Sequence, residues 1–92
     1  MTSSPSIGPT ATRILELLRE VTGDGEVMTD LDVGLFDSAL LDSLGVVTLI
    51  VALEGAFGLT IAPSELDRDA WATPRLLVAD VQARLAAAEG AA

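Results

Sequence analysis

The chain has 92 residues, half of them apolar but only three of them aromatic, so its core must be built mainly from aliphatic side chains. Such a composition fits one helical domain better than a sandwich or a barrel. Fourteen acidic and five basic residues give a net charge of −9, which disfavours nucleic acid and anionic membranes as partners. The absence of cysteine and histidine excludes disulfides and thiolate zinc sites and removes the commonest general base.

The first half of the chain is predicted to hold one helix and a long connection. We expect residues 1–8 to be a disordered lead-in without a signal-peptide pattern. Helical apolar spacing then predicts a helix from Pro9 to Gly23, where glycine favours its end. Residues 24–41 lack periodicity and carry five acidic residues and no basic one. We predict an ordered crossover loop, because its apolar residues can pin it to the core. These are Val27, Leu31, Val33, Leu35, Phe36, Leu40 and Leu41.

A second long helix is predicted from Asp42 or Ser43 to Phe57, with Gly58 as its end. Its apolar stripe comprises Val46, Leu49, Ile50, Leu53 and Phe57. Leu44, Val47 and Val51 lie away from the centre of this stripe. This additional apolar surface indicates either a docking site for partner proteins or deeper burial of the helix.

The last third of the chain is predicted to be helical as well. We expect a short helix or turn over residues 63–70, then a helix that Thr73 caps and Pro74 opens. Its inward face should comprise Leu76, Leu77, Val78, Val81 and Leu85. The predicted fold is an all-α, four-helix bundle of three longer helices and one short one, with a long loop between helices 1 and 2. The domain spans residues 9–88, and residues 89–92 form a frayed tail.

Ser43 is the principal candidate functional residue. Its position alone favours helix capping. However, the apolar and acidic segment before it should deliver it to an exposed corner, where an attached anion would meet the positive end of a helix dipole. The rest of the chain offers no nucleophile with a base beside it.

Two motifs resemble those of carrier proteins. Residues 35–59 resemble the phosphopantetheine attachment region of acyl and peptidyl carrier proteins, whose hallmark is Asp-Ser-Leu at the head of the second helix, here residues 42–44. Residues 64–74 (SELDRDAWATP) resemble the corresponding segment of D-alanyl carrier proteins, and Gly45 also fits that subfamily. The resemblance extends over roughly residues 10–87 and includes the four-helix fold.

The resemblance implies a cofactor and partners rather than catalysis. 4'-Phosphopantetheine would be attached covalently to Ser43 by a phosphopantetheinyl transferase, with Asp42 in a supporting role. An amino-acid adenylation enzyme would load the arm with an aminoacyl thioester, and a downstream acyltransferase would unload it. Docking is expected to involve Leu44, Val47, Val51 and Glu54. We expect a cytoplasmic, monomeric, non-enzymatic carrier that neither binds nucleic acid nor inserts into a membrane.

Three other residues or motifs have simpler interpretations. We expect Trp71 to be a core anchor and Arg68 to pair with a nearby carboxylate. Asp30-x-Asp32 resembles the start of a calcium loop, but Leu35 and Leu41 stand where such a loop needs glycine and glutamate. We therefore predict no metal site.

Several functions remain open at this point. All five basic residues are arginine and alanine is abundant, which favours a GC-rich bacterium and a carrier in natural-product, polyketide-type biosynthesis. The alternative is D-alanylation of teichoic acids, and a fatty-acid carrier ranks third. From a different class, the rival is a helical interaction module without a prosthetic group, in which Ser43 only caps its helix.

Overall fold

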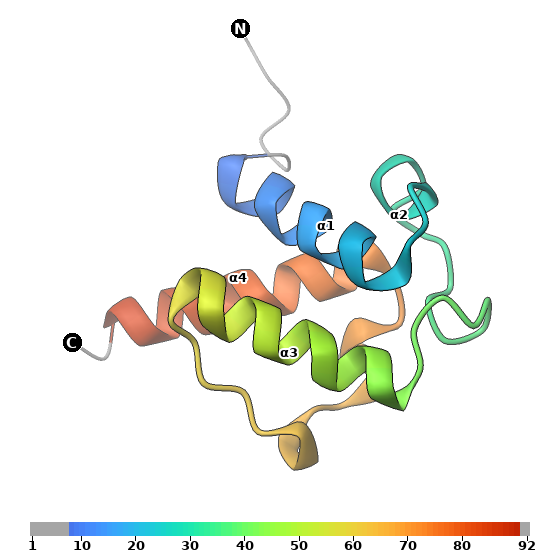
Figure 1. Cartoon of the computed structure of the whole chain (residues 1–92). Coiled ribbons are helices and arrows are strands. Elements are labelled where there is room, and N and C mark those ends of the chain that lie inside the picture. Colours follow the sequence, from blue (N-terminus) through green and yellow to red (C-terminus); the bar gives the residue numbers. More distant parts are fainter. Residues whose placement is uncertain (1–7, 91–92) are drawn as a thin grey trace, which may run out of the picture.

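A computed structural model describes residues 8–90, which form helices, turns and loops without any strand (Figure 1). The three long helices are α1 (Pro9–Thr22), α3 (Ser43–Phe57) and α4 (Pro74–Gly90). A single turn of helix, α2 (Glu26–Thr29), lies in the crossover, and two 3-10 turns, η1 (Pro63–Glu65) and η2 (Arg68–Trp71), connect α3 to α4. The predicted all-α, four-helix fold is confirmed.

The helix ends follow local sequence signals. Pro9 opens α1, and Gly23 ends it with φ 73°, its amide donating to the carbonyl of Arg19. Gly58 ends α3 in the same way, with φ 70° and its amide donating to the carbonyl of Glu54. Glycine suits both positions because other residues are strained at positive φ. These predicted boundaries are confirmed.

The core lies where α1 packs against both α3 and α4. Its buried members include Ile14, Leu18, Leu49, Leu53, Trp71, Leu77 and Val81. The Trp71 indole is fully buried, and its Nε1 donates to Oδ2 of Asp80 on α4 at 2.8 Å. The same carboxylate oxygen accepts from Nε of Arg84 at 2.8 Å. Trp71 is thus the core anchor that we predicted.

The crossover between α1 and α3 is ordered, as predicted, because it contributes Val27, Leu35 and Leu41 to the core. It also contains α2, which we did not predict. The Asp24 carboxylate starts this turn by accepting from the amide of Glu26 at 2.9 Å. Four helical residues are too few to produce a 3.6-residue periodicity in the sequence.

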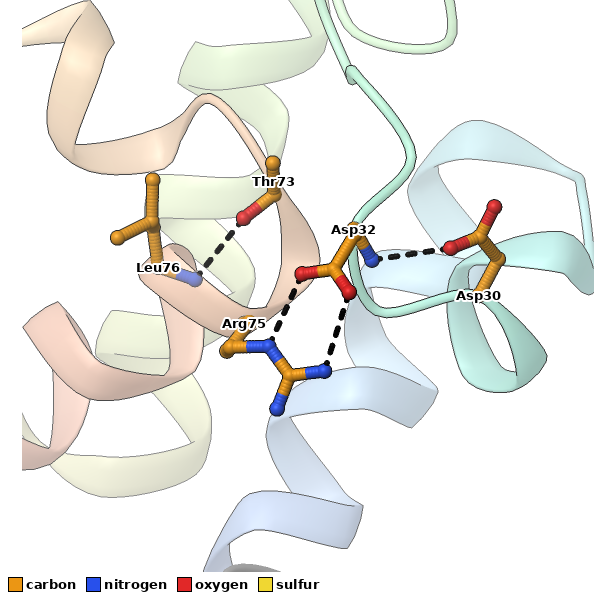
Figure 2. Close-up of polar contacts among 5 residues, drawn as sticks. All are labelled: Asp30, Asp32, Thr73, Arg75 and Leu76. Carbon is orange, nitrogen blue, oxygen red and sulfur yellow. Dashed lines mark hydrogen bonds and ion pairs between the residues drawn. The ribbon is translucent and has the colours of Figure 1, made fainter.

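The crossover is attached to the start of α4 (Figure 2). The Leu31 carbonyl accepts from the Arg75 amide at 3.0 Å, and the Arg75 guanidinium donates to both carboxylate oxygens of Asp32 at 3.0 and 3.2 Å. Asp30 accepts from the Asp32 amide at 3.0 Å. The hydrogen bonds from Arg75, and then its positive charge, lower the pKa of Asp32. The two aspartates therefore organise the loop, and the described residues contain no cluster of three or more potential metal ligands.

Two details of the last third differ from the prediction. Leu76 does not face inward, since its side chain is 45% exposed. At 3.6 residues per turn, three consecutive residues cannot all face the core, and Leu77 and Val78 do so instead. Extended backbone at Leu66 and Asp67 divides the predicted short helix into η1 and η2.

The predicted domain boundaries at residues 9 and 88 can be compared with the structure only within residues 8–90. Helix α4 includes residues 89 and 90, which we had placed in the frayed tail. Residues 1–7 of the predicted disordered lead-in, and residues 91–92, lie outside the described residues. None of the helices in residues 8–90 is both long and apolar enough to cross a membrane.

Candidate functional site

Ser43 is the first residue of α3, and Asp42 is its N-cap. The Asp42 Oδ1 atom accepts from the Gly45 amide at 2.7 Å, so the interpretation of Ser43 as a cap is wrong. Ser43 is exposed, and its hydroxyl has no hydrogen-bond partner within residues 8–90. Because capping is supplied by its neighbour, the Ser43 hydroxyl remains available for modification.

The segment before Ser43 forms a turn that holds the residue at an exposed corner. Leu35 and Leu41 are both buried, and the Leu41 amide donates to the Leu35 carbonyl at 3.0 Å. Between them Ala39 adopts φ 59°, a left-handed conformation that alanine rarely occupies. Two buried leucines therefore anchor the turn on both sides of its strained residue and set where α3 begins.

Gly45 is needed for the close approach of the Asp42 cap. A Cβ atom at position 45 would lie 3.2 Å from Oδ1 of Asp42 and 3.2 Å from Cδ1 of Leu41. Both contacts are tighter than ordinary van der Waals packing. We had associated Gly45 only with a subfamily pattern, and the structure supplies the physical reason for glycine there.

A mainly apolar groove of about 220 Å³ opens beside Ser43. It is lined by Phe36, Ser43, Val46, Val47, Pro63, Leu66 and Arg68. These residues come from the crossover, the first turns of α3, and the two 3-10 turns with the link between them. The sequence did not identify this groove, because no local pattern reveals that residues 36 and 63–68 meet the start of α3.

Arg68 differs from its predicted role. We expected an ion pair, but its guanidinium carbon lies 4.2 Å from the centroid of the Phe36 ring. Arg68 has no ion pair with the side chains that the structure describes. The arrangement is a cation–π contact, in which an aromatic face attracts the positive charge.

The four predicted docking residues fall into two groups. Leu44, Val47 and Val51 are 74%, 44% and 62% exposed, so the alternative of deeper burial is wrong for them. Glu54 is only partly exposed, and its Oε2 accepts from the Ile61 amide at 3.1 Å. That carboxylate therefore holds the segment after α3, a role that the sequence did not reveal.

These surroundings fit an anionic group attached to Ser43. The serine lies at the end of α3 where the backbone amides point outward, and the first turn of the helix contains no acidic residue. Arg68 lies on the wall of the same groove. Asp42 opposes an anion by its charge, but one of its oxygens already accepts from the Gly45 amide.

Comparison with known protein families identifies the family of this chain. Residues 12–81 match the family described as "Phosphopantetheine attachment site". The chain belongs to this family. It is a carrier protein whose cofactor is 4'-phosphopantetheine, held covalently on a serine, and such carriers act together with a phosphopantetheinyl transferase and with ligase or acyl-transfer enzymes.

Three similar proteins belong to one branch of the carriers, the D-alanyl carrier proteins. The D-alanyl carrier protein of Enterococcus faecalis is 40% identical over 70 residues, which are 76% of this chain and 90% of that protein. The D-alanyl carrier protein of Lactococcus lactis is 43% identical over 70 residues, covering 76% and 89%. That of Lacticaseibacillus casei is 42% identical over 69 residues, covering 75% and 85%. The family resemblance stated from the motifs is confirmed.

Proposed function

We propose that Ser43 is the attachment serine of this carrier and that the chain holds an aminoacyl group as a thioester on its arm. One observation carries the assignment of the site. Ser43 is exposed at the first position of α3, while the cap is supplied by Asp42. The oxygen of a capping serine would already accept from a backbone amide, whereas the capping bond of α3 is made by Asp42 and not by Ser43.

The reaction that loads the cofactor requires little from the carrier. The Ser43 oxygen attacks the phosphorus of coenzyme A that bears the pantetheine, the bond from this phosphorus to the bridging oxygen of the pyrophosphate breaks, and a phosphodiester forms. The nucleotide part of coenzyme A leaves, and the serine proton passes to a base of the transferase. In this proposal the transferase binds coenzyme A together with a magnesium ion, and the Asp42 carboxylate, next to the attacking serine, helps to orient that complex. The attached group then supplies a thiol that accepts the acyl cargo as a thioester.

The carrier itself contributes placement and recognition, and we propose that it is not catalytic. Its sequence contains no histidine or cysteine, and all five of its basic residues are arginine. The chain thus lacks histidine, the most frequent general base, and lysine and cysteine, two of the side chains that form covalent intermediates. Activation of the amino acid then belongs to a separate adenylating enzyme and unloading to a downstream acyltransferase. In this proposal the carrier acts in the cytoplasm as a monomer.

D-Alanine is the cargo that we now place first. The three relatives named above are all D-alanyl carrier proteins, and each is aligned over at least 85% of its length. This support outweighs the composition argument for natural-product biosynthesis, which rested on the arginine-only basic residues and the abundance of alanine. Teichoic acid D-alanylation, our earlier alternative, therefore becomes the leading proposal for the pathway.

Docking to the partner enzymes is proposed to rely on the apolar patch on α3, defined as Leu44, Val47 and Val51. Their exposed fractions are large for apolar side chains on a chain with a net charge of −9. A patch of three side chains is small, and small interfaces suit a carrier that must leave each partner after one transfer.

Intact-mass measurement tests the attachment site directly. The protein is incubated with coenzyme A and a broad-specificity phosphopantetheinyl transferase, alongside Ser43→Ala and the control Ser38→Ala, which removes another exposed serine. We expect one phosphopantetheinyl group on the wild type and on Ser38→Ala, and none on Ser43→Ala. Modification of Ser43→Ala would move the site elsewhere. Failure to modify the folded wild type would favour an interaction module that resembles a carrier only in fold.

The cargo is tested next on the holo protein. It is offered D-alanine, L-alanine, glycine and other amino acids with a D-alanine-adenylating enzyme and with broader adenylating enzymes, and the thioester is detected by mass. We expect D-alanyl thioester to form preferentially. Loading only with a different amino acid, by a different enzyme, would reject the D-alanyl proposal and leave the carrier role intact.

A further inference from the structure

Arg68 contacts an aromatic ring, whereas the other arginines with a described partner contact carboxylates. Arg13, Arg75 and Arg84 each form an ion pair with a carboxylate. Arg68 instead lies over the Phe36 ring, and it is the cationic side chain that lines the groove beside Ser43. A positive charge on the wall of this groove is notable because the chain carries a net charge of −9.

The stacking contact leaves Arg68 able to bind an anion. A guanidinium that lies on an aromatic ring uses its planar face, whereas its N–H groups point outward from its edge. Among the described residues no hydrogen bond uses the side chain of Arg68. The Phe36 ring therefore restricts the position of the guanidinium without occupying the donors that suit a phosphate.

The groove also has an apolar part of the right kind. Val46, Val47, Pro63 and Leu66 line it together with Ser43. In the cofactor, the phosphodiester at the serine is followed directly by the pantoyl unit, whose quaternary carbon bears two methyl groups. Outward from Ser43, the arm thus consists first of an anion and then of an apolar group. The groove offers a cation and apolar side chains that can contact them.

We propose that Arg68 binds the phosphodiester on Ser43 and that the groove receives the adjoining pantoyl unit, so that the first part of the arm rests on the protein. This inference relies on the proposed attachment at Ser43. Arg68 also offsets the repulsion between the phosphodiester and the neighbouring Asp42 carboxylate. Because Arg68 is exposed, the docked arm remains in equilibrium with a free arm that a partner enzyme can capture.

NMR of apo and holo protein tests the proposal. Amide chemical shifts are measured in ¹⁵N-labelled wild type before and after modification, together with the ³¹P shift of the phosphodiester. The measurements are repeated with Arg68→Gln and with the control Arg13→Gln, which removes the same charge from an exposed position on α1 outside the groove. Fluorescence of the buried Trp71 reports whether each variant is folded.

In the wild type we expect holo-minus-apo shifts at Phe36, Leu66 and Arg68 as well as at the residues next to Ser43. An exposed charge contact of about 0.4–1 kcal/mol corresponds to a roughly two- to fivefold change in the ratio of docked to free arm. Arg68→Gln should lower that ratio by this factor. The shifts at Phe36 and Leu66 should then become smaller, and the ³¹P resonance should move toward its value in a free phosphodiester. Arg13→Gln should leave both unchanged.

Other outcomes would overturn the inference. Shifts confined to the neighbours of Ser43 would mean that the arm extends freely into solvent. Equal shifts in wild type and Arg68→Gln, or equal losses in Arg68→Gln and Arg13→Gln, would remove any specific role for Arg68. In each case the mass gain at Ser43 would persist, so the proposed function would stand. Only the absence of modification would count against that function instead.

Discussion

Removal of the Asp42 cap should destabilise α3 by a measurable amount. Its Oδ1 accepts from the Gly45 amide at 2.7 Å, the one side-chain cap of this helix end. Replacing an N-cap aspartate by alanine costs about 1 kcal/mol, within a range of about 0.5–2. For a domain of this size that corresponds to a fall in Tm of roughly 4–8 °C. Asp42→Asn retains an oxygen acceptor and should change the stability by only a few tenths of a kcal/mol.

The two variants separate capping from cofactor attachment. Urea and thermal unfolding are followed by the fluorescence of Trp71, which is buried in the folded chain and exposed on unfolding. The rate of phosphopantetheinyl transfer is measured in parallel by intact mass. If the Asp42 carboxylate helps to orient the complex of coenzyme A and magnesium in the transferase, Asp42→Asn should slow the transfer without destabilising the fold. Asp42→Ala should slow the transfer and also destabilise the fold.

Two results would refute this reasoning. An Asp42→Ala protein that unfolds at the wild-type midpoint would show that the bond to Gly45 contributes nothing to stability. An Asp42→Asn protein that is modified at the wild-type rate would show that transfer does not need the charge of the carboxylate. Gly45→Ala provides an independent check, because its Cβ would crowd the same oxygen at 3.2 Å. It should reproduce part of the loss in Tm.

Three further predictions follow from the fold. Val47→Asp should weaken binding to an adenylating partner more than added salt does, in a titration of holo protein, whereas a larger effect of salt would contradict apolar docking. Gly58→Ala should lose about 1–2 kcal/mol in urea unfolding because φ is 70°, whereas Gly55→Ala, in a helical position with open space around it, should gain roughly 0.5–1 kcal/mol; equal effects would contradict the helix-end assignment. The hydrogen bonds and charge of Arg75 lower the pKa of Asp32 in the folded state, so their stabilisation is present at neutral pH and lost as pH falls through that lowered value, below about 3.9. Asp32→Asn should therefore be slightly less stable than wild type at pH 7 and equal to it in strong acid, and a difference that persists in acid would exclude this pair as its cause.

The agreement between sequence and structure is greatest where a signal lies within one turn of the chain. Pro9 and Gly23 bound α1, and Gly58 ends α3, because the backbone preferences of proline and glycine act locally. The Thr73 hydroxyl oxygen accepts from the Leu76 amide at 3.2 Å, as predicted for a threonine that caps the helix opened by Pro74 (Figure 2). A helix cap, a glycine that ends a helix and a periodic apolar stripe can each be predicted without knowledge of the rest of the fold.

The errors occur where a residue's role depends on what packs against it. Leu76, Leu77 and Val78 have similar hydrophobicity, so their order cannot say which of them faces solvent. Arg68 was expected to find a carboxylate, since the chain is rich in acidic residues, but the fold brings it to Phe36 instead. The docking role of Glu54 stays a prediction, but its contact with the Ile61 amide could not be predicted, because it arises only when the segment after α3 folds back.

The sequence by itself determined the helical class, the boundaries of the long helices and the motif at Ser43, because each is specified by residues within a few positions of one another. Only the tertiary structure decided what surrounds that serine. The groove beside it joins side chains from residues 36–68, and the crossover that delivers it is attached by a contact between Asp32 and Arg75, 43 positions apart. Such contacts depend on how α1, α3 and α4 share one core, and burial of apolar surface, which drives that packing, is non-directional and does not specify the partner of any one residue.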